Sequence, residues 1–258
     1  MKLHIFGCCA GFESISNYNH TSFALEVGED VYWFDAGESC SNTAHLKGVD
    51  LTKVSNIFIS HTHMDRVGGL FNLVWFIYKL AGWYKKCLPN NGKINLFIPN
   101  METWKGILQM LLHTRERCPW DTDVIATQIK DGLIYKDENI EVLAYHNRHQ
   151  EIYECGSQLS FSFKIRGEEK TIVYSGEVED LSELDQLLVE HCDYLLIETG
   201  NHQMKDICVY VNAKDVKDVI CIHHSREILC NISQARLEIT KYAKRNIILA
   251  VDCDSLIL

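Results

Sequence analysis

The sequence contains few prolines and glycines, the residues that break regular secondary structure and dominate low-complexity repeats. Its 258 residues include 3 prolines and 15 glycines, which excludes a collagen-like repeat and a chain dominated by Pro/Gly-rich linkers. The longest apolar stretch, residues 70–78, is less than half of the ~20 residues that a membrane-spanning helix needs. We also expect no signal peptide, because the first residues contain no long apolar core.

Basic residues are in the minority. The 25 lysines and arginines stand against 35 aspartates and glutamates, which gives a formal net charge of −10 at pH 7. Proteins that coat nucleic acids carry the opposite sign of charge. The negative charge therefore argues against a general nucleic-acid-binding role. With 47% hydrophobic and 23% charged residues, the composition is that of an ordinary globular protein.

Cysteine and histidine are abundant. The 11 cysteines are an odd number, so they cannot all pair within the chain, and no Cys-x-x-Cys pair occurs. We therefore expect a reducing, cytoplasmic setting in which most thiols are small buried apolar groups. The 12 histidines are the second unusual count, and several of them follow predicted strands.

Apolar β-rich runs and helical patterns alternate along the chain. Pairs of strands come first, and strands that alternate with helices follow, which predicts an α/β fold with two packed sheets and outer helices, in a single domain over residues 1–258. Asn100 and Ser233 stand where helix N-caps are expected. The predicted strands are residues 2–6, 22–27, 31–34, 56–60, 94–98, 140–145, 159–165, 171–174, 194–197, 219–222 and 247–251. The predicted helices are residues 69–84, 101–113, 181–191, 214–218 and 233–244.

A histidine motif directly follows one of these strands. His61, His63 and Asp65 form His-x-His-x-Asp after a hydrophobic strand, and Gly68-Gly69 comes next. Two imidazoles and a carboxylate suit a divalent transition metal, zinc first, with manganese, iron or nickel also possible. The two glycines let the backbone pass close to such a site. The pattern therefore predicts a metal centre at the end of this strand.

The motif and four further segments resemble the metallo-β-lactamase superfamily, whose hallmark is His-x-His-x-Asp-His after a strand. The resemblance implies the four-layer αββα sandwich of that superfamily. Asp35 resembles the family's early aspartate, which braces the metal loop. The matching segments are residues 34–37, 61–65, 142–149, 171–177 and 219–225.

The resemblance also implies the metal ligands. It assigns His61, His63, His149 and Glu177 to a first metal, with His149 favoured over His146 as the third imidazole. It assigns Asp65, Glu177 and His223 to a second metal, with Glu177 between the two ions. The cofactor implied is zinc, as one or two ions.

Two residues depart from the family pattern. Arg66 stands where the family has the last histidine of its motif, and Glu177 stands where it has aspartate. Arginine stays protonated and cannot act as an ordinary ligand. Three interpretations stay open: a weak second metal site, a single metal with Arg66 supplying positive charge, or a site that has lost hydrolysis.

Within the superfamily, the chain is most similar to the ribonuclease Z-like and small phosphodiesterase branch. The resemblance implies a hydrolase that uses metal-bound hydroxide, with Asp65, Arg66 and His202 as catalytic candidates. A tRNA substrate is not expected, because the 28 positions from His149 to Glu177 leave no room for a tRNA-gripping arm. The expected substrate is a small phosphodiester, such as a cyclic nucleotide.

Two alternatives to a phosphodiesterase stay open. The same metal centre could hydrolyse a thioester, lactone or amide, or the chain could be a non-catalytic ligand-binding member of the fold. A homodimer is also plausible by resemblance, and the aromatic-rich segment 71–120 is the expected contact.

Overall fold

The computed structural model describes residues 1–11, 13, 15–114, 123–150 and 159–258. The chain divides into two compact units. The first consists of Met1–Gly7, Asn19–Ile129 and Cys253–Leu258, and the second of Cys8–Tyr18 and Lys130–Asp252. The prediction of one domain over residues 1–258 stays a prediction.

The first unit contains a seven-stranded sheet with the order β14-β1-β2-β3-β4-β5-β6. Strands β14, β1, β2 and β3 pair antiparallel, whereas β3 to β6 are parallel to one another. The carboxyl ends of β3, β4, β5 and β6 therefore lie at one edge. The strands are β1 (Lys2–Gly7), β2 (Ser22–Val27), β3 (Asp30–Phe34), β4 (Val54–Phe58), β5 (Ile94–Ile98), β6 (Val124–Gln128) and β14 (Ser255–Ile257).

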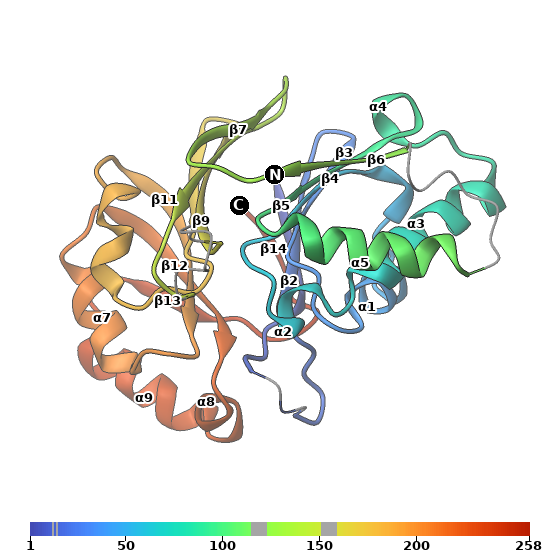
Figure 1. The fold of residues 1–258 in the computed structure, drawn as a ribbon. Coiled ribbons are helices and arrows are strands. Elements are labelled where there is room, and N and C mark those ends of the chain that lie inside the picture. The colour runs from blue at the N-terminus through green and yellow to red at the C-terminus, as the bar shows by residue number, and fades with distance from the viewer. Residues whose placement is uncertain (12, 14, 115–122, 151–158) are drawn as a thin grey trace. The chain divides into compact units, whose positions relative to one another are not determined.

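Helices cover one face of this sheet (Figure 1). The buried residues of α3 are Leu70, Leu73, Val74, Ile77 and Ala81, a spacing that places them on one side of the helix. They join the buried side chains of β1 to β6 in a single apolar core. The helices are α1 (Cys40–Leu46), α2 (Met64–Val67), α3 (Leu70–Tyr84), α4 (Pro89–Gly92), α5 (Met101–Leu112) and a 3-10 turn, Leu51–Lys53.

The second unit contains another seven-stranded sheet, with the order β13-β12-β11-β10-β9-β8-β7. Strands β10 to β13 are parallel, and β7 to β10 pair antiparallel. Strand β8 consequently runs in the same direction as β10, and its carboxyl end lies at the same edge. The strands are β7 (Gly132–Lys136), β8 (Glu141–His146), β9 (Phe161–Gly167), β10 (Lys170–Tyr174), β11 (Cys192–Thr199), β12 (Val216–His224) and β13 (Asn246–Leu249).

The helices of the second unit pack on its central parallel strands. Strand β11 lies between two parallel neighbours and its last five residues are buried, as expected of a strand covered on both faces. The apolar sides of α7 and α9 join this core. The helices are a 3-10 segment (Leu181–Gln186), α7 (Met204–Asn212), α8 (Arg226–Cys230) and α9 (Ile232–Tyr242).

Most predicted elements exist, but two predicted helices are wrong. Of residues 214–218, the first two precede β12 and the last three begin it, and β12 pairs with β11 and β13. Residues 181–191 form a 3-10 segment and turns, begun by a capping box at Asp180. Asn100 is the N-cap of α5, as predicted, whereas Asn231 caps α9 in place of Ser233.

The described cysteines are largely internal. Cys8, Cys9, Cys40, Cys192, Cys208 and Cys221 are buried, whereas Cys118 and Cys155 lie outside the described residues. Burial raises the pKa of Cys40 to about 12, so its thiol is a poor nucleophile at neutral pH. These thiols behave as small apolar groups, and the cytoplasmic setting stays a prediction.

The aromatic-rich segment is partly internal. Trp104 is buried in the first core, whereas Trp83 is 82% exposed and Tyr84 is exposed at the end of α3. Trp120 lies outside the described residues. The homodimer contact over 71–120 therefore stays a prediction. In the described part of the chain, every helix is too short or too polar to cross a membrane.

Candidate metal centre

The histidine motif follows β4 in the first unit. His61 is buried three residues after the strand, and His63 is the N-cap residue of α2. The His61 Nε2 and His63 Nδ1 atoms lie 3.1 Å apart. The two imidazoles therefore turn one ring nitrogen each toward the other.

Asp35, at the end of neighbouring β3, holds the loop that carries these histidines. Its carboxylate accepts hydrogen bonds from the Ser60 backbone N (2.7 Å) and Ser60 Oγ (2.9 Å). Ser60 Oγ also lies 3.2 Å from His61 Nδ1, which leaves His61 Nε2 facing His63. Such a buried partner fixes the orientation of an imidazole ligand. Asp35 has φ 51°, a strained conformation for a residue with a side chain.

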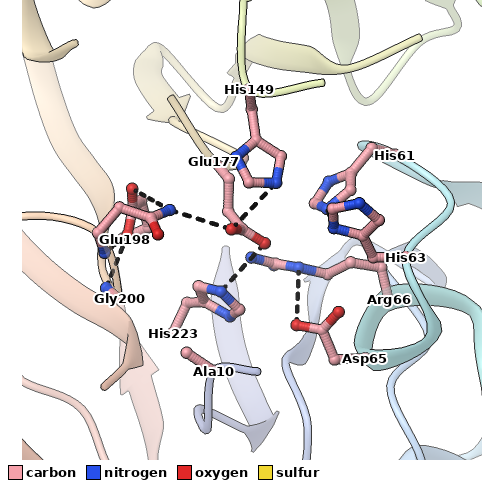
Figure 2. Close-up of polar contacts among 12 residues, drawn as sticks. Ala10, His61, His63, Asp65, Arg66, His149, Glu177, Glu198, Gly200 and His223 are labelled. Atoms are coloured by element: carbon pink, nitrogen blue, oxygen red, sulfur yellow. Dashed lines mark hydrogen bonds and ion pairs between the residues drawn. The ribbon is translucent and has the colours of Figure 1, made fainter. Parts of the chain in front are cut away.

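Arg66 is completely buried and contacts two carboxylates of the first unit. Its Nη1 donates to Asp35 Oδ2 at 3.1 Å, and its Nε lies 3.8 Å from Asp65 Oδ2, as Figure 2 shows for Asp65. The guanidinium thus places one fixed positive charge between the bracing aspartate and the aspartate of the metal motif. Sequence spacing alone did not predict the pairing of Arg66 with Asp35.

A glycine contact holds the two loops of the first unit together. A Cβ atom at Gly69 would lie 2.2 Å from the Gly37 carbonyl oxygen, far inside contact distance. The Gly69 backbone N donates to the Ala36 carbonyl oxygen at 2.8 Å. The Gly68-Gly69 pair therefore permits the close backbone passage that the sequence predicted.

The second unit gathers three predicted donors at one edge of its sheet. His149 follows β8, Glu177 follows β10 and His223 lies near the end of β12, so the shared strand direction brings them together. His149 Nε2 lies 3.2 Å from Glu177 Oε2, and His223 Nε2 lies 3.0 Å from Glu177 Oε1 (Figure 2). Glu177 is only 5% exposed. Its two oxygens therefore each face an imidazole nitrogen.

Glu198, near the end of β11, and Asn201, in the loop that follows, support Glu177. Asn201 Nδ2 donates to Glu177 Oε2 and to Glu198 Oε1, both at 3.1 Å. Glu198, which is fully buried, also accepts a hydrogen bond from the Gly200 backbone N (Figure 2) and one from the Asn201 backbone N. Neither supporting residue was assigned a role from the sequence.

His202 lies against Glu198. Its Nε2 lies 3.1 Å from the Val178 carbonyl oxygen and 3.3 Å from Glu198 Oε1. The hydrogen bond with Glu198 raises the pKa of His202. Burial acts to raise the pKa of Glu198, but the His202 hydrogen bond and the charge of His223 lower it overall. This ring nitrogen of His202 therefore holds the loop, and a catalytic role for His202 stays a prediction.

His146, the alternative candidate for the third imidazole ligand, pairs with Asp131 instead. His146 Nδ1 lies 2.5 Å from Asp131 Oδ2, and the His146 side chain is 51% exposed. Within the units, the structure thus brings His61 to His63, places Asp65 beside Arg66 and brings His149 and His223 to Glu177. His146 does not contact Glu177 among the described interactions.

His224, next to His223, has a structural role. It is fully buried, its Nδ1 lies 2.7 Å from Thr199 Oγ1 and its Nε2 lies 2.8 Å from the Ala250 carbonyl oxygen. Its backbone N donates to the Cys8 carbonyl oxygen. His224 thus ties three segments of the second unit behind His223, which has φ 51°.

The free energy of unfolding should fall in acid because of His224. Burial lowers the pKa of His224 from 6.5 to about 4. Between pH 6.5 and pH 4, the unfolded chain therefore binds a proton at this residue and the folded chain does not. We expect this residue to remove about 3 kcal/mol of stability as the pH falls from 6.5 to 4. Denaturant titrations across this range should show a steeper loss in the wild type than in His224→Gln. Equal slopes would contradict the assignment.

A family model described as Anti-Pycsar protein Apyc1 matches residues 1–223. The chain belongs to this family. This Apyc1-family chain is 25% identical over 244 residues to the anti-Pycsar protein Apyc1 of Bacillus phage 010DV004, which covers 87% of the chain and 89% of the phage protein. It is 29% identical over 152 residues to a ribonuclease Z of Methanocaldococcus jannaschii, which covers 58% of the chain but only 44% of that relative.

The fold of the Apyc1-family chain is that of the metallo-β-lactamases. Its structure superposes on the metallo-β-lactamase fold protein YhfI of Bacillus subtilis with a TM-score of 0.76, at 13% identity and over 99% of both chains. The predicted α/β fold class with two sheets and outer helices is therefore confirmed. The predicted relationship to ribonuclease Z-like proteins is confirmed as well.

Proposed function

We propose that the chain is a metal-dependent phosphodiesterase that hydrolyses a small phosphodiester. The observation that carries the proposal is the pair of imidazoles on Glu177, with His149 Nε2 and His223 Nε2 at 3.2 and 3.0 Å from its two oxygens. Imidazole nitrogens and carboxylate oxygens arranged in this way fit a divalent transition metal. Membership of the Apyc1 family and the ribonuclease Z relative support the same class of hydrolase.

The proposed metal ligands are those that the resemblance to the metallo-β-lactamases implies. His61, His63, His149 and Glu177 would hold one ion, for which zinc is the first choice and manganese, iron or nickel are alternatives. Asp65, Glu177 and His223 would be the donors left for a second ion. Because Arg66 is already ion-paired with Asp65, we propose that the first site is the one that binds tightly.

Three residues of the chain would have further roles in the hydrolysis: Asp65, Arg66 and His202. An ion held at the proposed metal site would supply Lewis acidity for the hydrolysis of a phosphodiester. Asp65 would orient the attacking water or accept its proton. Arg66 would offset the negative charge that develops on the phosphoryl group. His202, whose pKa is raised by Glu198, would contact the substrate or donate a proton to the leaving oxygen.

The proposed substrate is small and of the cyclic-nucleotide class. The net charge of −10 disfavours a long polyanion such as tRNA. The hairpin of β9 and β10 follows His149 and precedes Glu177, so a separate tRNA-binding arm is not part of this proposal.

A substrate panel tests the proposal. Bis-p-nitrophenyl phosphate and 3′,5′-cyclic nucleotides should be hydrolysed, whereas thioesters and lactones should not. His149→Gln should lower kcat by more than about 100-fold, the upper range for a residue that only supports a ligand. His146→Gln is the matched control and should retain turnover, because His146 pairs with Asp131 instead.

Three outcomes separate the alternatives. Turnover of thioesters or lactones without turnover of phosphodiesters would show that the chain is a thioester, lactone or amide hydrolase. Ligand binding with no turnover of any substrate would support a non-catalytic member of the fold. Equal losses in the two histidine variants would contradict the assignment of His149.

A further inference from the structure

A cavity in the second unit adjoins the proposed metal ligands. It has a volume of about 690 Å³ and is lined by the loop after β11 and by α8 and α9. Sites for small molecules and cofactors have volumes of roughly 300–1,000 Å³. Asn201 lines the cavity and also donates to Glu177 Oε2 at 3.1 Å. A molecule in this cavity would therefore lie beside the carboxylate that His149 and His223 contact.

The lining suits an uncharged planar group better than a phosphate. Met204 and Ala235 are buried and, with Ile228, give the cavity an apolar part. Arg226, the one arginine among the described residues of the lining, is ion-paired with Glu13. Two glutamates, at positions 227 and 238, also contribute to the lining, so its formal charge is negative.

Two amide side chains at the start of α9 offer a donor and an acceptor. Asn231 uses its Oδ1 to accept a hydrogen bond from the Gln234 backbone N at 3.3 Å, which leaves its NH₂ group outside that bond. Gln234 uses its Nε2 to donate to Glu238 Oε1 at 3.2 Å, which leaves its carbonyl oxygen outside that bond. Both residues line the cavity. The edge of a nucleobase carries matching acceptors and donors.

We propose that this cavity binds the base of a nucleotide substrate, with Asn231 and Gln234 contacting the edge of the base and Met204 and Ala235 packing against its face. The inference rests on the proposed function, since it takes the phosphodiester to lie at Glu177. It adds a subsite to the proposed cyclic-nucleotide substrate: the cavity holds the base, which determines part of the affinity.

Calorimetric binding tests the proposal without requiring turnover. Nucleoside 5′-monophosphates and ribose 5-phosphate share the sugar and the phosphate, so their affinity ratio isolates the base. The wild type should prefer the nucleotide. Asn231→Ser keeps the capping oxygen of α9 and removes the amide donor, and Gln234→Leu removes the acceptor. Each variant should lower the preference about 3- to 10-fold, the effect of one neutral hydrogen bond. Gln109→Leu, an exposed glutamine on α5, is the matched control and should keep the wild-type ratio.

The outcomes separate this inference from the proposed function. Equal binding of nucleotide and ribose 5-phosphate, or an unchanged ratio in both cavity variants, would overturn the base site even if phosphodiesters are hydrolysed. A base preference that both variants weaken would support the cavity even if the substrate panel shows no turnover. Circular dichroism of both variants, with the native spectrum retained, would exclude unfolding as the cause of a lost preference.

Discussion

We expect Glu177→Gln to lower both the metal content and the turnover of the protein. Glu177 offers both carboxylate oxygens to imidazoles, at 3.2 Å from His149 and 3.0 Å from His223, and the amide of glutamine keeps only one oxygen. The substitution conserves the size of the side chain but removes its charge. We expect kcat to fall by more than about 100-fold, beyond the upper range for a supporting residue. Mass spectrometry of metals in the purified protein should show the parallel loss of the ion.

Glu179→Gln provides the matched control for this change. Glu179 lies two residues away, is exposed and pairs with Arg148 at 3.6 Å, so its charge should not matter for metal binding. A second measurement is the shift of the melting temperature on adding zinc to the metal-free protein, which reports binding to the folded state. The shift should persist in Glu179→Gln and shrink in Glu177→Gln. Normal metal content and turnover in Glu177→Gln would remove this residue from the centre.

The resemblance to the metallo-β-lactamases implied the donors of each unit, and the strands that carry or precede them explain why they gather within each unit. An apolar run that ends at a polar residue indicates where a strand ends, and this signal is local in the sequence. Parallel strands then bring segments that are distant in the sequence to one edge of the sheet. This reasoning holds for His149, Glu177 and His223, which follow or end β8, β10 and β12. It also holds for Asp35 and Ser60 after the parallel strands β3 and β4.

Contacts made by loop conformation could not be predicted in the same way. Asn201 reaches Glu177 only because the loop after β11 turns back over Glu198. Arg66 reaches Asp35 across 31 positions, and no periodicity encodes that pairing. Strands β6, β7 and β14 were not predicted either, and β14 has only three residues, too few to show a periodic pattern. Residues 214–218 were predicted to be helical, but pairing with two neighbouring strands places the last three of them in β12.

Arg66→His should raise the number of bound metal ions from one to two per chain. In the wild type, the guanidinium is completely buried, donates to Asp35 at 3.1 Å and lies 3.8 Å from Asp65. An arginine cannot act as an ordinary ligand and its charge repels a cation, so we expect Asp65 to be a poor ligand beside it. A histidine at this position adds an imidazole and removes that charge. Metal analysis after dialysis against limiting free zinc should show the second ion.

Stability in the absence of metal provides an independent check on this substitution. Removing one partner of a buried ion pair costs about 3–5 kcal/mol, so metal-free Arg66→His should unfold at a lower denaturant concentration than the wild type. Added zinc should restore more stability to this variant than it gives to the wild type, because the second ion replaces the lost positive charge. Arg66→Met should be destabilised without this extra rescue, since it lacks a ligand. Two ions in the wild type would contradict the single-metal interpretation, and a single ion in Arg66→His would show that the lost imidazole is not what limits the second site.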